Sequence, residues 1–549
     1  MPSKNILIFN KYLLLIAFCI ILSSCSLLNK VTEQKSVSLV EAGILNAKNG
    51  EEAYRILYDS HLRANKEGKR ISYKGVEKIV LSIPYNAKSI PLTNFTDFEG
   101  VEFCVTNKSK DMVLFELSSK VEEIEVDPAY IDKGAYKKIN SLRKGDYLLC
   151  IQDAKPWVDH REGFDYGFKR RDIIKIHNGK GLNKPISNYS NEFSSAQCWY
   201  CAVSDSVVFQ NIKLTRTSES TNKTLLLDIR YQDNVSVRNV AISTPPSKLI
   251  ADNAISIRDC SNVALKNITI NGTYSSTSSF GYGIGVNNVC NLIIDRVYGR
   301  GNWGVFCTNN VNNVHLTNCD INRFDVHCYG RNIYFDKCNF VNLRNQFSSV
   351  FGIISFNECV FNSFIPVSNR TSFNAYVGYD IEIKNCTLNV TNKYDAFLVD
   401  LGRYDDVINK RNELSLKCVP NITVDNLTVN LPDDAVSFSI FHSKKADDFT
   451  GTIGYLNNIG LKDIVINYDG DKTIPIHISN NAYTTRNAFS CVMNNIEMRK
   501  SNAFRTKGQP NLKAGSISVE FKHCNEGESV SISPGREDTQ TVKYSNIIR

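Results

Sequence analysis

The chain has 549 residues, with 64 Lys and Arg against 56 Asp and Glu, which gives a formal charge of +8. Hydrophobic residues make up 42%, which excludes a mainly disordered chain. Because 14 Pro and 4 Met stand beside 25 Tyr and 28 Phe, the composition favours strands and excludes a helical bundle or a proline-rich linker protein.

The N-terminus predicts export. Lys4 and Lys11 form a basic start, and residues 13–22 form an apolar run that is too short to span a bilayer. The run ends in Leu22-Ser23-Ser24-Cys25, which resembles the lipobox of bacterial lipoproteins. An ordinary secretory signal is the alternative.

The lipobox resemblance implies that residues 1–24 are a signal peptide and that Cys25 is acylated. The mature protein would then be anchored by lipid in the cell envelope, on a periplasmic or surface face of the outer membrane. We interpret residues 25–45 as a tether between this anchor and the fold.

Residues 50–66 carry a helical pattern. The small or apolar side chains on one face belong to Ala53, Ile56, Leu57, Ser60 and Ala64. We expect this helix to cover an open sheet end. We assign residues 46–200 to this N-terminal cap and to irregular first coils, with further strands at 145–185.

A repeat fills the region assigned to 201–545. It reads Asn or Asp, apolar, any, apolar, any, polar, small or apolar, any, apolar, and it recurs every 19 to 41 residues. Its apolar period is two, which indicates strands rather than helices. Examples are NVSVRNVAI from Asn234, NVALKNITI from Asn262, NLIIDRVYG from Asn291, NVHLTNCDI from Asn313 and NIYFDKCNF from Asn332.

Units of this size bury their apolar rows only by stacking on one another. The pattern resembles the right-handed parallel β-helix of the pectin-lyase-like superfamily, so the expected fold is all-β with an N-terminal capping helix. The resemblance covers residues 200–500 well and 75–200 loosely. It does not determine an activity, because one fold hosts many functions. We expect a monomer.

Two further patterns predict structure rather than chemistry. The first Asn of each repeat falls in register, which predicts an Asn ladder at a turn. Four cysteines, Cys319, Cys338, Cys359 and Cys386, share another register position, which predicts an internal thiol ladder packed as small hydrophobes. Cys198 and Cys201 form a C-x-x-C on a strand, where side chains three apart face opposite ways.

The candidate site lies on the outside of the predicted coils. Arg323, Asp325, His327 and Tyr329 alternate along one strand, so all four are expected to face outward. Asp325 and His327 are candidate catalytic residues for acid–base work. Arg323 is assigned to the same group, and it would hold a substrate carboxylate or sulfate.

Neighbouring coils supply the remaining candidates. Aligning the strands places Arg344 and Asn302 beside Arg323, and Phe306 beside His327. We assign these three residues and Tyr329 to substrate binding, with Tyr329 and Phe306 stacking against a sugar ring. An ion-pair cluster without chemistry is the alternative. Four glycines on the same face predict a groove floor, or else close backbone packing: Gly281, Gly283, Gly285 and Gly304.

Two acidic groups are weaker candidates. Asp228 and Asp252 lie on adjacent coils and form a possible carboxylate pair. A second cluster, in one longer coil, offers oxygens for Ca²⁺ but is better explained as a solvated loop. Its members are Asp395, Asp400, Asp405 and Asp406. No cofactor is otherwise expected.

Enzymes of this fold give a partial match. Residues 252–286 faintly resemble polygalacturonases, but Asn253 stands at a paired Asp and Tyr282 at the His of Gly-His-Gly. Pectate lyases bind Ca²⁺ with several acids beside an Arg base, and no acid cluster accompanies Arg323. We therefore transfer neither catalytic mechanism.

The sequence thus favours an enzyme that cleaves a polysaccharide, with an anionic glycan as the first candidate, by hydrolysis or elimination. The alternatives are a glycan-binding or adhesin-like solenoid without catalysis, and a purely structural surface protein. Nucleic acid is not an expected partner, because Lys and Arg do not gather in one stripe.

Overall fold

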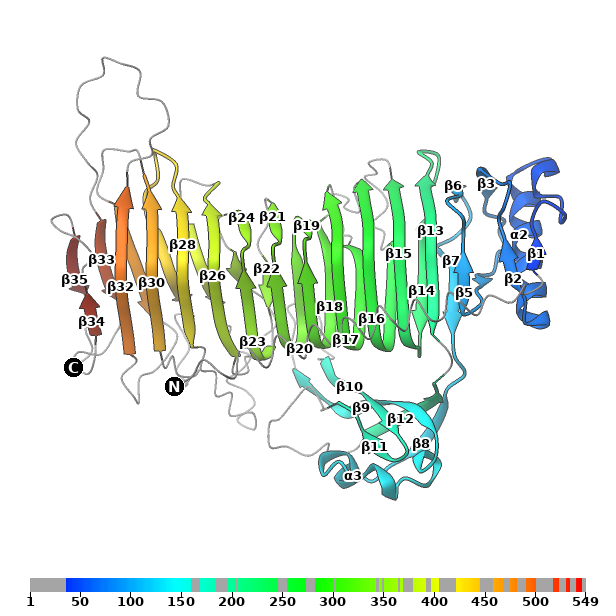
Figure 1. Ribbon diagram of the computed structural model, residues 1–549, viewed down its shortest axis with the longest axis horizontal. Helices are drawn as coiled ribbons and strands as arrows, with labels where there is room; N and C mark the ends of the chain where they lie inside the picture. The colour runs from blue at the N-terminus through cyan, green and yellow to red at the C-terminus, as the bar shows by residue number, and fades with distance from the viewer. Residues whose placement is uncertain are drawn as a thin grey trace, which may run out of the picture.

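The computed structural model shows a right-handed parallel β-helix that is closed at its N-terminal end by a helix and carries one side domain (Figure 1). It describes residues 36–545 with internal gaps. The gaps are 159–167, 184–195, 204–205, 245–253, 273–281, 301–302, 342–344, 348–349, 364–365, 369–378, 392–395, 404–420, 445–457, 469–473, 481–489, 500–516, 523–529 and 534–539.

Parallel pairing between successive coils builds the β-helix. Its first strands are β3 (Lys78–Ser82), β4 (Ile90–Pro91), β5 (Phe95–Asp97), β6 (Glu102–Thr106), β7 (Met112–Ser118), β13 (Val207–Arg216), β14 (Thr224–Arg230), β15 (Asp233–Thr244), β16 (Ile255–Gly272), β17 (Tyr282–Arg300) and β18 (Gly304–Thr317). The middle strands are β19 (Asp320–Ile321), β20 (Phe324–Asp336), β21 (Asn339–Val341), β22 (Asn345–Phe347), β23 (Val350–Asn357), β24 (Val360–Asn362), β25 (Val367–Ser368) and β26 (Tyr379–Asn389). The last are β27 (Ala396–Arg403), β28 (Ile422–Asn430), β29 (Phe438–Lys444), β30 (Asn458–Asn467), β31 (Ile474–Asn480), β32 (Ser490–Arg499), β33 (Ile517–Lys522), β34 (Val530–Ser533) and β35 (Gln540–Ser545).

This pairing confirms the β-helix that the repeat predicts. Alternate apolar side chains point into the coil and form one continuous core, which extends from the cap to Tyr468. Aromatic rings stack along the axis inside it, with centroids 4.6 Å apart for Phe335 and Phe356 and 5.4 Å apart for Phe340 and Phe361. Each coil therefore buries the apolar row of the next, which no single repeat achieves alone.

Corners between the strands use the left-handed backbone conformation. In the five repeats quoted above, the first Asn occupies such a corner, with φ between 52° and 58°. Their amides also bond from coil to coil, since Nδ2 of Asn291 donates to Oδ1 of Asn262 at 2.9 Å and Nδ2 of Asn313 to Oδ1 of Asn291 at 2.9 Å. The predicted Asn ladder is confirmed as a structural element, because Asn tolerates this conformation better than most residues.

A second ladder allows the two roles of Asn to be separated. Asn239 has φ 55°, donates to Asn211 at 2.8 Å and accepts from Asn267 at 3.1 Å. Asn239→Gly should lose only the side-chain bonds, whereas Asn239→Ala should also pay about 1–2 kcal/mol for the left-handed backbone. Urea unfolding measures both variants, and equal midpoints would contradict the backbone argument.

The four-cysteine ladder is also confirmed. Cys319, Cys338, Cys359 and Cys386 each follow a left-handed corner residue, and all four are buried free thiols. They are in contact along the axis, since the backbone N–H of Cys359 donates to Sγ of Cys386 at 3.4 Å. They fill the core as small apolar groups.

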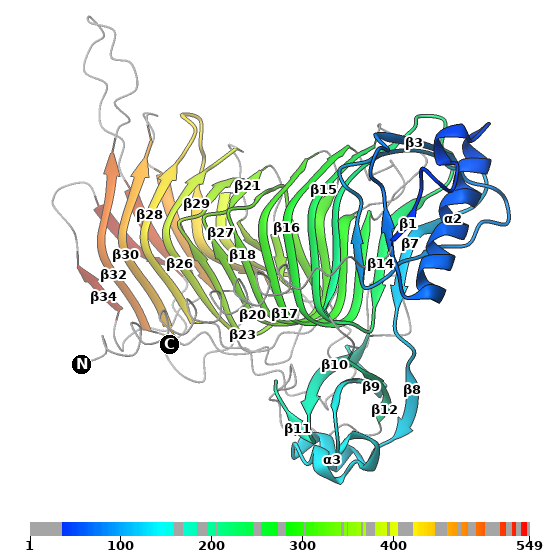
Figure 2. The same cartoon turned by 45° about the vertical axis from the view of Figure 1, so that its right-hand side comes forward.

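The predicted capping helix is α2 (Gly50–Glu67). Asn49 caps its N-terminus by accepting from the backbone N–H of Glu52 at 2.9 Å, and Gly68 ends it with φ 62°. Its buried face includes Ala53, Leu57, Ser60 and Ala64, and it lies against β3 and β4 at the end of the β-helix (Figure 2). The helix thus covers the apolar end of the first coil.

His61 in α2 makes the cap sensitive to acid. Its ring is fully buried, Nε2 lies 2.7 Å from the Tyr73 hydroxyl, and burial lowers its pKa to about 3. Below about pH 6.5 the unfolded chain binds a proton at His61, whereas the folded cap does not. The contribution of His61 to the free energy of unfolding is therefore complete above that pH and decreases below it.

We therefore expect the His61 contribution to fall by about 2 kcal/mol between pH 6.5 and 5, and to continue falling towards pH 3. Urea midpoints measured across this range for the wild type and for His61→Gln give the test. The variant should be less stable at pH 7 but should depend less steeply on pH. Parallel pH profiles would show that another group controls the acid response.

A side domain interrupts the β-helix between β7 and β13. It is a mainly antiparallel sheet of β8 (Glu122–Glu125), β9 (Asp146–Val158), β10 (Phe168–His177), β11 (Lys180–Gly181) and β12 (Ala196–Ala202), with α3 (Pro128–Asp132) beneath it (Figure 1). β10 contacts β16, β17 and β18, and Lys175 pairs with Asp233 at 2.5 Å.

This domain corrects the predicted division at residue 201. Strands β5, β6 and β7 pair directly with β13 and β14, so regular coils precede the insertion as well as follow it. The side domain has its own apolar cluster, to which Cys198 belongs, whereas Cys201 packs in a second cluster with Cys290 of the β-helix. The C-x-x-C therefore faces two ways, as its strand spacing predicts.

Across the described part of the chain, no helix combines the length and apolar character needed to cross a membrane. The predicted signal peptide, Cys25 and most of the tether lie outside the described residues.

Candidate functional site

One face of the β-helix carries the candidate site; we call it the site face. It is formed by β14, the first residues of β16, β17, β18 and β20, then β22, β25, β27 and β29. One outward row crosses these strands in register. It comprises Asp228, Ser256, Gly285, Cys307, Asp325, Gln346, Ser368, Asp400 and His442.

Asp325 is the centre of the site. It points away from the core yet has no exposed surface, because side chains from three coils cover it. Its Oδ1 accepts from Nε of Arg323 at 2.5 Å, and its Oδ2 accepts from the Tyr282 hydroxyl at 2.6 Å. The Arg323 guanidinium also donates to Oε1 of Gln346 at 2.9 Å and stacks over the Trp303 ring at 4.6 Å.

His327 brings this cluster to the surface. Its side chain is 16% exposed, and its Nε2 lies 3.0 Å from the Tyr282 hydroxyl and 3.5 Å from Oδ2 of Asp325. Its Nδ1 lies 3.3 Å from Sγ of Cys307 on the preceding coil. The Trp303 indole N–H donates to the same Tyr282 hydroxyl at 3.2 Å. The imidazole is thus held through both of its nitrogens.

Electrostatic interactions keep both Asp325 and His327 charged. Burial alone would raise the pKa of Asp325, but the charge of Arg323 and the bond with His327 outweigh it and lower that pKa. Burial alone would also lower the pKa of His327, but Cys307 and Asp325 raise it to about 10. His327 is therefore an imidazolium at neutral pH and acts as a proton donor rather than a base.

Burial and the charge of Asp325 also raise the pKa of Tyr282. The Tyr282 hydroxyl therefore stays protonated. It donates to the carboxylate and orients the groups around it.

The structure brings together Arg323, Asp325 and His327, as the alternation predicts. Arg323 is only 2% exposed and is committed to Asp325 and Gln346, so it supports the site instead of facing a substrate carboxylate. Asn302 and Arg344 lie outside the described residues.

Two predicted substrate-binding residues are placed elsewhere. Tyr329 occupies a left-handed corner with φ 62° and is 2% exposed, so it does not continue the outward row. Phe306 points into the core, where its ring lies 5.5 Å from Phe324. Neither residue forms a stacking surface for a sugar, and both assignments are wrong.

The error over Phe306 has a physical cause. Phe306 pairs with Phe324 and Cys307 with Asp325, and an irregularity between Thr308 and Asn309 then shifts the register. Val305 and Phe306 are both buried, so simple apolar alternation does not show which one faces inward. An alignment that extends back from the pair Asn309 and Cys328 without this shift places Phe306 opposite Asp325 and therefore on the outward side.

At Gly304 and Gly283 the predicted glycine patch is not an open floor, whereas Gly285 is partly exposed. A Cβ on Gly304 would lie 2.8 Å from the Tyr282 ring, so the missing side chain makes room for that tyrosine. Gly283 is buried, and Gly281 lies outside the described residues. The close packing of the Tyr282 side chain therefore explains why position 304 is a glycine.

Of the weaker acidic candidates, the structure describes Asp228 and Asp400. Asp228 is buried and paired with Arg230 and with Arg258, the latter at 2.8 Å. Asp400 bonds to Nδ1 of His442 at 2.8 Å. Asp252, Asp395, Asp405 and Asp406 lie outside the described residues. Within the described ranges, no group of three or more His, Cys, Asp or Glu is arranged to hold a metal ion.

Sequence reasoning missed three residues of the site. Tyr282 enters the sequence analysis only as a departure from a family motif, and neither Cys307 nor Trp303 is among its candidates. The three come from the beginnings of two successive coils and converge on β20. A correct register for β18 would have identified Cys307, because it pairs directly with Asp325.

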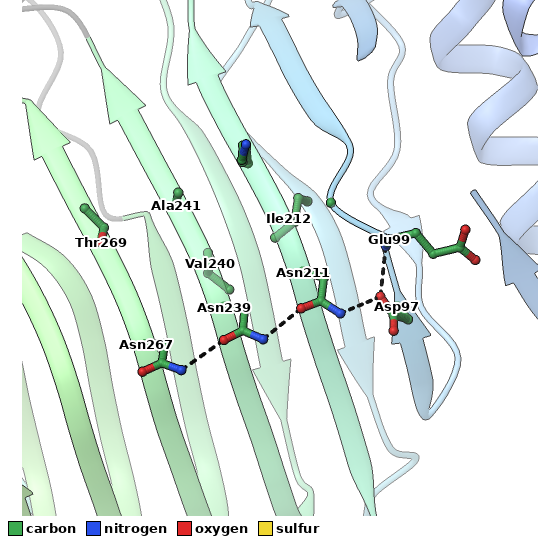
Figure 3. A pocket seen from close by; sticks show the side chains of 11 residues that line it. Asp97, Glu99, Asn211, Ile212, Asn239, Val240, Ala241, Asn267 and Thr269 are labelled. Carbon is green, nitrogen blue, oxygen red and sulfur yellow. Dashed lines mark hydrogen bonds between the residues drawn. The ribbon is translucent and has the colours of Figure 1, made fainter. Parts of the chain in front are cut away.

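A separate open depression of about 560 Å³ lies at the N-terminal end of another face. Figure 3 shows the second Asn ladder crossing it, from Asp97 through Asn211 and Asn239 to Asn267. Since these side chains bond to one another in series, the depression is a structural corner and not a second reactive site.

Comparison with known proteins supports no assignment to a family. No family model matches the chain, and no curated protein matches it. Among solved structures, it is similar to the gp54 tailspike of Acinetobacter baumannii bacteriophage AP22, solved with A. baumannii capsular saccharide. That match has 13% identity and a TM-score of 0.46, and it covers 92% of this chain and 76% of that one.

Two further structures are similar. The gp49 tailspike of Pseudomonas phage LKA1 has 11% identity and a TM-score of 0.46, with 93% of this chain and 83% of that chain covered. The catalytic domain of a GH87 alpha-1,3-glucanase has 10% identity and a TM-score of 0.28, with 77% and 92% covered.

Proposed function

We propose that this protein binds a polysaccharide along the site face and cleaves it beside His327. The observation that carries the proposal is the Arg323–Asp325–His327 cluster on the outside of the coil. It keeps a partly exposed imidazolium fixed by a fully buried carboxylate. Buried charges are costly, and a perturbed, partly exposed histidine held in this way indicates a reactive site.

The shape of the site face suits an extended polymer. Its outward row crosses nine strands in register, and adjacent strands lie about 4.8 Å apart, so the row spans about 38 Å. Several sugar units would lie along this length. In cleavage, His327 would give a proton to the leaving glycosidic oxygen, and Asp325 would hold the imidazolium in place.

A panel of acidic and neutral polysaccharides tests this proposal with the full chain. Reducing ends alone would identify hydrolysis, whereas reducing ends with the ultraviolet absorbance of unsaturated uronates would identify elimination. Loss of both in His327→Gln would place the reaction at this site. The absence of product and of glycan binding across the panel would overturn the proposal.

One observation favours a binding protein without catalysis as the second candidate. Hydrolysis by two carboxylates requires both of them to reach the sugar, whereas Asp325 has no exposed surface. A non-catalytic solenoid predicts that His327→Gln leaves glycan affinity unchanged and that the wild type releases no product.

We also propose that Cys25 carries the lipid that anchors the protein in the cell envelope. The support is the Leu-Ser-Ser-Cys sequence after a basic start and a short apolar run. Labelled palmitate fed to growing cells should enter the wild type but not Cys25→Ala. Equal labelling of both would refute the anchor.

A further inference from the structure

A thiol completes the arrangement around His327. Cys307 is the residue of β18 in the outward row, and it pairs in register with Asp325. Its Sγ lies 3.3 Å from Nδ1 of His327. Among cysteines whose exposure the structure describes, only Cys307 and Cys104 are partly exposed. The other nine are buried. Cys307 is therefore an accessible thiol in contact with a histidine.

The imidazole lies between the thiol and the carboxylate. Nδ1 faces Cys307, whereas Nε2 faces Asp325 at 3.5 Å and the Tyr282 hydroxyl at 3.0 Å. This is the order nucleophile, proton carrier, orienting acid that activates a weak nucleophile. Thr308 stabilises the local geometry, since its hydroxyl donates to the backbone carbonyl of Asp325 at 2.7 Å.

Cys104 shows how different an ordinary surface thiol is. Its Sγ lies 3.3 Å from Oε1 of Glu102, an anion that disfavours a thiolate, and no imidazole contact is recorded for it in the described chain. Burial and Glu102 raise the pKa of Cys104. The contrast makes Cys104 a matched control for Cys307.

We propose that Cys307 is a nucleophile activated by His327, and that the site hydrolyses carboxylic esters, the O-acyl groups of a glycan. The glycan as carrier of the ester rests on the function proposed above, whereas the Cys307 nucleophile does not. Ester hydrolysis at such a site needs no metal and no second exposed carboxylate.

The steps balance with water as the only co-reactant. His327 already carries the proton of the Cys307 thiol, and the sulfur attacks the acyl carbon. The carbon–oxygen bond to the sugar breaks, and the imidazolium protonates the departing sugar oxygen. Water then gives a proton to the neutral His327 as its oxygen attacks the thioester. The carbon–sulfur bond breaks, the carboxylic acid leaves, and the sulfur is again paired with the protonated His327.

p-Nitrophenyl acetate mixed with the full chain tests the nucleophile. We expect a burst of p-nitrophenol of about one equivalent per chain, with an acetyl group on the Cys307 peptide after acid quenching. Cys307→Ser should abolish the burst, His327→Gln should slow it about 100-fold, and Cys104→Ser should leave it unchanged.

A second measurement keeps the proposal falsifiable if the Cys307 variants fold poorly. In the wild-type chain at pH 6, iodoacetamide should modify Cys307 at least about tenfold faster than Cys104, as peptide mapping would show. Equal alkylation rates, or acetyl groups on other residues only, would overturn the proposal.

Acetate release from an O-acetylated polysaccharide then tests whether the ester that is hydrolysed is carried by a glycan. Release that depends on Cys307 without new reducing ends would support the esterase even if chain cleavage fails. An acetylated Cys307 with no release from any glycan in the panel would refute the glycan ester as substrate and leave the nucleophile supported.

Discussion

Replacing Asp325 by alanine is expected to lower the free energy of unfolding by about 3–5 kcal/mol. The guanidinium of Arg323 and the imidazolium of His327 would remain in the fold without the carboxylate that balances them. Because Arg323 is almost fully buried, water cannot replace the lost partner. Urea unfolding followed by tryptophan fluorescence measures the loss, since Trp303 lies over Arg323.

Asp228→Ala is the matched control for this prediction. Asp228 occupies the same outward row four strands away and is equally buried, but its partners Arg230 and Arg258 are 34% and 40% exposed. Water can solvate these arginines once the carboxylate is gone, so we expect a smaller loss, about 1 kcal/mol. Equal losses in the two variants would contradict the argument from burial.

The second large effect concerns activity. His327→Gln should reduce product formation from the polysaccharide by about 10²–10⁴-fold, because glutamine keeps a hydrogen-bonding side chain but supplies no proton. His315→Gln is the control: this histidine lies on β18, on another face of the preceding coil, and stacks on Tyr334. A similar loss in both variants would indicate damage to the coil and not to the chemistry.

The raised pKa of His327 also predicts how activity changes with pH. Because the pKa of His327 is raised to about 10, the imidazolium persists through neutral pH, and activity that needs it should fall only as pH rises through about 10. The stability from this group is complete below about pH 6.5 and is lost between 6.5 and 10. A fall in activity near pH 6.5 would contradict the assignment.

Much of the fold was predictable because it is local and repetitive. Three features lie within a single coil and are repeated in the next coils. They are the apolar period of two, the Asn at a left-handed corner and the small thiol in one register position. Stacking then repeats the same contact, so one correct unit predicts its neighbours. The helix at 50–66 was equally predictable, since its apolar face and the Asn49 cap lie within 20 residues.

The site was predictable only in part. Alternation along one strand brought Arg323, Asp325 and His327 to the same side, and this holds in the structure. The same rule failed at Tyr329, where the backbone turns through a left-handed corner, and at Phe306, which follows another buried residue. Alternation describes a straight strand and contains no information about corners or bulges.

The sequence by itself thus determined the β-helix, its cap, its ladders and the three residues at the centre of the site. Tertiary structure alone decided that the side domain interrupts regular coils, and that Tyr282 and Cys307 meet His327. These contacts join residues 20 to 45 positions apart through the register between coils. That register is set by side-chain packing over whole coils, and a shift of one residue moves every side chain to the opposite face.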